Sequence, residues 1–138
     1  MISKRLIWFL ERHNVLSTSQ SGFRRQRSTL DHILALHDDA VKSISNGRYL
    51  VAVFLDFERA YDMVWRDGLL SKLFGLGLRG RSLRWIRAFL GNRTARVRVG
   101  TCFSNWFELQ NGLVQGSAIS PILFTVMIND YMGIIIDA

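Results

Sequence analysis

An uninterrupted apolar run, Leu50 to Leu55, ends at a single carboxylate, Asp56. The run is rich in β-branched and aromatic residues and follows the turn-forming pair Asn46-Gly47, so it predicts a buried strand. A charge at the end of a buried strand is unfavourable unless it is paired or binds a metal. We therefore expect Asp56 to have a functional role.

Two further carboxylates, Glu58 and Asp62, follow on an expected short helix. Carboxylates at rigid positions can hold Mg²⁺ while leaving it free to bind phosphate oxygens, as two-metal polymerases and nucleases require. The alternative is that Glu58 and Asp62 flank Arg59 in a surface ion pair. We prefer the ion pair for Glu58 and a metal site for Asp56.

The charge of the chain is positive and unevenly distributed. The 138 residues carry 18 Lys and Arg against 11 Asp and Glu, a net charge of +7, and 49% are hydrophobic, which fits one globular domain or part of one. No acid lies between Asp67 and Glu108, whereas eight basic residues do. Such a stretch favours a polyanionic partner, with nucleic acid preferred over membrane because Arg predominates. A merely solvated basic surface is the alternative.

Other classes of protein are disfavoured. Cys102 is the single cysteine, which excludes a disulfide framework or a thiolate zinc cluster. No stretch has the composition of a signal peptide or a membrane span. We expect an intracellular protein, in the cytoplasm or nucleus, and leave its oligomeric state open.

Helices and one hairpin are expected around the apolar run, which indicates a mixed α/β (α+β) chain. Apolar periodicity and capping residues predict helices over residues 2–12, 28–45, 67–75, 81–90 and 120–132. The last begins at Ser120-Pro121 and should be amphipathic. Residues 94–99 alternate as a strand does, and residues 102–109 could be its hairpin partner.

Two loops could approach a ligand. Residues 115–121 place a glycine beside small residues at the start of a helix, which allows close backbone approach and favours anions. Residues 22–29 form a basic loop that enters a helix and suits phosphate. Each pattern is weak alone.

Taken in order, three segments resemble the reverse transcriptase domain, most closely that of non-LTR (LINE-type) retrotransposons. Residues 20–31 are similar to its fingers motif, and residues 54–65 to the palm motif with the first catalytic Asp. Residues 112–124, followed by Ile128-Asn129-Asp130, are similar to its template- and nucleotide-positioning motif. The similarity runs from about residue 14 to residue 131.

The resemblance implies a partial fingers–palm fold, with fingers over about 1–50 and palm over about 51–138. The palm would be an incomplete antiparallel sheet flanked by helices. The parent activity would be RNA-directed DNA synthesis by two-metal phosphoryl transfer, with Mg²⁺ or Mn²⁺ as cofactor. RNA template, DNA primer and deoxynucleoside triphosphates would be the partners.

The resemblance also implies roles for individual residues. Asp56 matches the catalytic metal-binding Asp, with the Phe57 backbone carbonyl as an extra ligand. Tyr61, where the family more often has Phe, matches a gate that would clash with a 2′-hydroxyl, and Gln115 with Gly116 matches the nucleotide pocket. The implied phosphate contacts are Arg24 and Arg27 toward nucleotide or template, and Arg84, Arg87, Arg96 and Arg98 toward the template–primer duplex. Asp62 is assigned to structure before catalysis.

One departure from the family pattern limits the expected activity. The next motif, an aromatic-Ala-Asp-Asp turn, should follow Asp130, and Asp137 cannot replace it. We therefore expect this chain to be inactive alone, as a fragment of a gene model or a decayed element. A non-catalytic nucleic-acid-binding remnant is the alternative. A third possibility is a chain that does not fold stably, because missing strands leave an open sheet edge.

Overall fold

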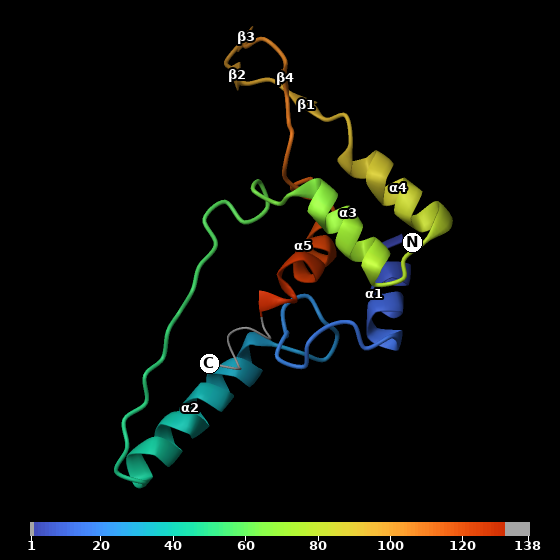
Figure 1. Cartoon of the computed structure of the whole chain (residues 1–138). Coiled ribbons are helices and arrows are strands. Elements are labelled where there is room, and N and C mark those ends of the chain that lie inside the picture. The colour runs from blue at the N-terminus through green and yellow to red at the C-terminus, as the bar shows by residue number, and fades with distance from the viewer. Residues whose placement is uncertain (1, 132–138) are drawn as a thin grey trace.

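The computed structural model describes residues 2–131, which form helices and short strands (Figure 1). These elements are α1 (Ile2–Arg12), α2 (Thr29–Ser45), α3 (Arg66–Gly75), α4 (Gly80–Leu90), β1 (Thr94–Ala95), β2 (Arg98–Val99), β3 (Cys102–Phe103), β4 (Phe107–Glu108) and α5 (Ser120–Ile128). The helices predicted over 2–12, 28–45, 67–75 and 81–90 are confirmed to within a residue or two. Among the described residues, no helix has the length and hydrophobicity needed to cross a membrane.

The hydrophobic core is made by four of the five described helices. Helix α3 packs against α4 and α5, and α1 packs against α5. Aliphatic side chains from these helices and their connections fill the space between them. The buried apolar residues are Leu6, Leu10, Val64, Leu69, Leu70, Leu73, Leu78, Ile86, Leu90, Leu113, Ile119, Ile122, Leu123 and Val126.

Helix α2 lies outside this core and extends away from the other helices (Figure 1). Its start follows the sequence prediction, because the backbone N–H of Ser28 donates a 2.7 Å hydrogen bond to the Asp31 carboxylate. The apolar stripe of the helix is nevertheless exposed, and no residue of α2 is buried. Local capping and helix propensity therefore define α2 without tertiary packing.

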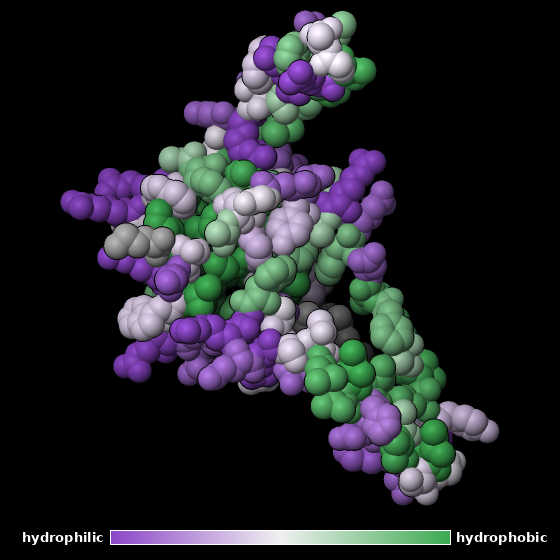
Figure 2. Space-filling view, turned by 180° about the vertical axis from the view of Figure 1, so that it is seen from behind, coloured by the Kyte–Doolittle hydropathy of each residue, from purple (hydrophilic) through white to green (hydrophobic). Residues whose placement is uncertain are grey.

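The buried strand predicted over residues 50–55 is not found. Residues 48–57 form neither helix nor strand, and Val51 and Phe54 are 84% and 82% exposed. The segment returns from the far end of α2, and its apolar side chains form a hydrophobic surface with those of α2 (Figure 2). A strand needs a hydrogen-bonded neighbour and a covering layer, and the described residues supply neither to this segment.

The sheet also differs from the expected one. Residues 94–108 form the predicted hairpin, in which β1 pairs with β4 and β2 pairs with β3, both antiparallel. Gly100, with φ of 59°, lies in the two-residue connection between β2 and β3. The hairpin extends beyond the helices (Figure 1), so it is not the helix-flanked antiparallel sheet that was expected for the palm.

Helix α5 begins at Ser120 and is buried on several sides. Ile119 is its N-cap, and the Ser120 hydroxyl donates a 2.7 Å hydrogen bond to the Val114 carbonyl. Ile122, Leu123, Thr125 and Val126 are all buried. The predicted amphipathic pattern is therefore wrong for this helix, because α1 and α3 both pack against it. The predicted end at Met132 lies outside the described residues.

Candidate active site

Two segments far apart in the sequence pair directly beside the core. The Leu113 N–H donates to the Tyr61 carbonyl, and the Gly112 N–H donates to the Val64 carbonyl, each at 2.8 Å. Gly112 has φ of 90°, and a Cβ at this position would lie 2.7 Å from the Asp62 carbonyl oxygen. Glycine is therefore required for this approach, which brings the Tyr61 and Gln115 regions together.

The paired segments border an open hollow of about 560 Å³. Its lining is Tyr61, Gln115, Gly116, Ser117, Ala118, Ser120 and Pro121. The Gln115 Nε2 donates a 3.0 Å hydrogen bond to Asp62 Oδ1 on the opposite segment. Three residues predicted from sequence for nucleotide binding, Tyr61, Gln115 and Gly116, thus line one hollow.

Aromatic packing on α5 holds the Tyr61 side of the hollow. The Tyr61 ring stacks on Phe124, with centroids 5.2 Å apart and an interplanar angle of 26°. The Phe57 ring meets Phe124 edge-on at 6.1 Å and Tyr131 at 5.8 Å. These contacts attach the end of the exposed segment, next to Asp56, to the same helix that supports Tyr61.

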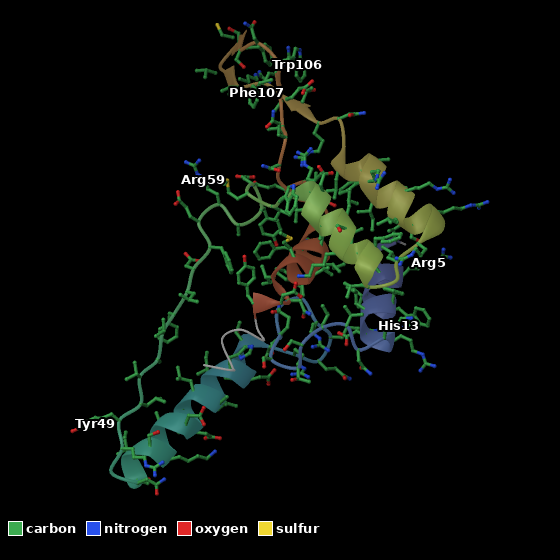
Figure 3. The ribbon with its side chains drawn as sticks, viewed as in Figure 1. Arg5, His13, Tyr49, Arg59, Trp106 and Phe107 are labelled. Carbon is green, nitrogen blue, oxygen red and sulfur yellow. The ribbon has the colours of Figure 1, made fainter. Side chains whose placement is uncertain are left out.

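The three carboxylates of this region, Asp56, Glu58 and Asp62, have different surroundings. Asp56 is exposed, and Glu58 pairs with Arg59 at 3.8 Å, which confirms the preferred interpretation of Glu58 as a surface ion pair. Figure 3 shows Arg59 directed away from the helices. Asp62 instead accepts the Gln115 hydrogen bond. Within residues 2–131, no group of three or more His, Cys, Asp or Glu side chains could hold a metal ion.

The predicted phosphate-binding arginines of the basic loop contact the chain itself. Arg24 forms a bidentate pair with the Glu11 carboxylate at 2.9 and 2.7 Å and also donates to the Ser17 and Gln20 carbonyls. The Arg24 hydrogen bond lowers the pKa of Glu11. Arg27 donates to the Thr18 carbonyl and is exposed. Arg24 therefore orders the loop, whereas Arg27 makes one hydrogen bond to the loop from an exposed position.

The four arginines predicted to face a duplex lie on two elements. Arg84 and Arg87 are exposed on α4. On the hairpin, the Arg96 guanidinium lies over Phe103 at 3.9 Å and over Trp106 at 4.7 Å, and Arg98 lies 5.7 Å from Phe103. Figure 3 shows Trp106 on this projecting hairpin. Arginine side chains thus lie against aromatic rings on an exposed arm.

Sequence reasoning missed two arginines that do not line the hollow but donate hydrogen bonds to the backbone of the segment that precedes Gln115. Arg66 is 8% exposed and donates to the Gly112 and Asn111 carbonyls at 3.0 and 2.6 Å. Arg93 donates to the same Gly112 carbonyl at 2.9 Å. Burial and the neighbouring Arg93 lower the pKa of Arg66. The sequence offers little indication of this role, because the acceptors are backbone carbonyls, 45 and 46 residues from Arg66 and 19 residues from Arg93.

Comparison with known proteins accounts for the three motifs. The profile of the family described as reverse transcriptase (RNA-dependent DNA polymerase) matches residues 1–138. A probable RNA-directed DNA polymerase from transposon BS of Drosophila melanogaster is 32% identical over 133 residues, and one from the mobile element jockey is 31% identical over 130 residues. A Pol polyprotein of the retrotransposable element R2 from Popillia japonica is 26% identical over 133 residues.

The matches cover most of this chain and a small part of each relative. The alignments to the BS and jockey polymerases span 94% of the chain and 14% of each relative. The R2 alignment spans 96% of the chain and 18% of the relative. No solved structure matches the chain significantly. Because the family profile covers every residue and the relatives are polymerases of non-LTR elements, the chain belongs to the reverse transcriptase family.

Proposed function

We propose that this chain carries the nucleotide-positioning part of a reverse transcriptase. The parent reaction is attack of a primer 3′-hydroxyl on the α-phosphate of a deoxynucleotide paired to an RNA template, with release of pyrophosphate. The observation that supports the assignment is the convergence of Tyr61 with Gln115 and Gly116 on one hollow. In this proposal Tyr61 excludes the 2′-hydroxyl, and Gln115 with Gly116 borders the base and sugar.

Residues about 1–50 would belong to the fingers and residues about 51–138 to the palm. Asp56 and the Phe57 carbonyl would contribute ligands for Mg²⁺ or Mn²⁺, since oxygen ligands suit both ions. Two-metal phosphoryl transfer needs further side-chain ligands besides Asp56. Among residues 2–131, no group of three or more His, Cys, Asp or Glu side chains could hold a metal ion. We therefore expect no primer extension by the isolated chain, and extension in a gel assay with RNA template, DNA primer and Mg²⁺ would contradict this.

The nucleotide pocket can be tested on the 138-residue chain by equilibrium binding. We expect Mg-dUTP to bind more tightly than Mg-UTP, which differs from it only by the 2′-hydroxyl, and Tyr61→Ala to reduce this preference by roughly tenfold because the ring no longer crowds that hydroxyl. Tyr49→Ala is the matched control, since Tyr49 is 98% exposed beyond the end of α2 (Figure 3). The control should retain the preference.

Two results would contradict the pocket assignment. One is absence of deoxynucleotide binding by the unmodified chain. The other is an equal loss of preference in Tyr61→Ala and Tyr49→Ala, which would mean that the discrimination does not arise at Tyr61.

A second candidate function is non-catalytic binding of nucleic acid through the basic surface. The exposed Arg84 and Arg87 on α4, together with the Arg96 and Arg98 arm, favour it. A pure binder should hold an RNA–DNA duplex equally well with or without Mg²⁺, and Asp56→Ala should have no effect. Dependence on both would favour the polymerase assignment, whereas independence of both would favour the binder.

A further inference from the structure

The turn that precedes Gln115 is held on both of its sides. On one side, the N–H groups of Gly112 and Leu113 donate to the carbonyls of Val64 and Tyr61. On the other side, the carbonyls of Asn111 and Gly112 accept from arginine side chains. The backbone of 111–113 is therefore fixed by five hydrogen bonds to elements outside its own segment.

Arg66 makes two of these hydrogen bonds from an electrostatically unfavourable position. It is the first residue of α3, where the partial positive charge of the helix N-terminus disfavours a cation. It is also buried, and the cationic Arg93 donates to the same Gly112 carbonyl. A buried cation at this position is tolerated because its N–H groups have carbonyl acceptors at 3.0 and 2.6 Å.

Arg66 also links the two segments that border the hollow, because it follows the Tyr61–Val64 segment in the sequence and donates hydrogen bonds to the 111–112 segment. It lies two residues after Val64 and begins the helix that packs on α4 and α5. Arg93 lies at the base of the hairpin, where its carbonyl accepts from the Leu109 N–H. The two guanidinium groups thus tie the turn to α3 and to the hairpin at once.

We propose that Arg66, assisted by Arg93, is a positioning residue that holds the Gln115–Gly116 wall of the hollow against Tyr61. The proposal rests on the nucleotide-binding role proposed above. Arg66 itself does not line the hollow and acts through the backbone of residues 111–113. Its planar fork can reach two carbonyls at once, whereas a lysine ammonium would satisfy them less well.

Amide hydrogen exchange of the full chain, followed by NMR, tests this positioning directly. In Arg66→Leu, we expect the amides of Gly112 and Leu113 to exchange at least tenfold faster, while the buried Leu73 amide in α3 keeps its rate. Arg66→Lys should give a partial effect. Arg87→Leu is the matched control, because Arg87 is an exposed arginine on α4, and it should leave all three rates unchanged.

If Arg66→Leu does not fold, a second variant, Arg93→Leu, can be used for the same exchange measurement. Arg93→Leu removes a single hydrogen bond to Gly112 from a half-buried residue and leaves the start of α3 intact. Faster exchange at Gly112 and Leu113 with an unchanged Leu73 rate would support the proposal. Unchanged exchange at Gly112 and Leu113 in folded Arg66→Leu would overturn it, as would unchanged exchange in Arg93→Leu where Arg66→Leu does not fold.

The consequence for ligand binding is measured separately. With α3 intact, Arg66→Leu should reduce the preference for Mg-dUTP over Mg-UTP about as much as Tyr61→Ala does, which a purely structural role would not predict. Retained preference despite faster exchange would overturn the positioning role. If the unmodified chain binds no nucleotide, the proposed function fails, and the exchange rates still decide whether Arg66 holds the turn.

Discussion

Replacing Gly112 by alanine tests whether the pairing of residues 61–64 with 112–113 holds the site together. Gly112 has φ of 90°, which an L-residue rarely adopts. A Cβ there would lie 2.7 Å from the Asp62 carbonyl oxygen and 3.0 Å from the Asp62 Cα. Both contacts are with backbone, which cannot rotate away as a flexible side chain could.

The magnitude follows from two separable terms. A residue forced into this region of φ costs about 1–2 kcal/mol. Overpacking a close contact that cannot relax adds typically 1–3 kcal/mol. We therefore expect Gly112→Ala to lower the free energy of unfolding by about 2–5 kcal/mol. A small domain of marginal stability would then be largely unfolded.

The assay is urea unfolding monitored by circular dichroism. Gly47→Ala is the matched control, because Gly47 has φ of 66° and no atom within 4 Å of its added Cβ. The control therefore carries the conformational term without the contact term, and it should lose only about 1–2 kcal/mol. If Gly112→Ala and Gly47→Ala lose equal stability, the close approach to Asp62 does not exist and the derived geometry of the site is refuted.

Two further predictions concern the core and the basic loop. Leu123→Ala, at a fully buried position on α5, should lower the free energy of unfolding by about 2–5 kcal/mol. Leu34→Ala on the exposed stripe of α2 should change it by less than about 0.5 kcal/mol, and equal losses in urea unfolding would contradict the assigned core. The hydrogen bond from Arg24 holds the pKa of Glu11 below its ordinary value of 4.5. Between the lowered pKa and about pH 4.5, the unfolded chain therefore binds more protons than the folded chain. The contribution of the Arg24–Glu11 pair to the free energy of unfolding is thus fully present above about pH 4.5 and is lost as the pH falls through the lowered pKa. Wild-type stability should fall more steeply on acidification than that of Glu11→Gln, and parallel curves would show that the pair contributes nothing.

Helix positions follow from local chemistry, which explains why they were predictable. The apolar repeat of α1, the Ser28 and Asp31 cap of α2 and the glycines around α4 all act within a few residues. The hairpin over 94–108 was predictable for the same reason, because its strands are joined by two residues. Local patterns suffice where the hydrogen-bond partners are close in sequence.

The prediction of a strand over residues 50–55 was wrong because strand formation depends on partners that are distant in the sequence. Its composition favours a strand, but a strand is completed by partners elsewhere in the chain. The described residues place no such partner beside it. The same pattern therefore yields an exposed extended segment, while the aromatic contacts of Phe57 begin only where the chain returns to α5.

The sequence by itself determined the family, the helices and the identities of Asp56, Tyr61, Gln115 and Gly116 as candidates, because these depend on residue type, order and short-range periodicity. Only the tertiary structure decided which of them meet. Tyr61 and Gln115 share one hollow because backbone hydrogen bonds at Gly112 and Leu113 join the two segments. The positioning role proposed for Arg66 could be inferred only from the tertiary structure, because its acceptors are main-chain carbonyls. Every residue carries such a group, so no sequence pattern distinguishes the acceptors.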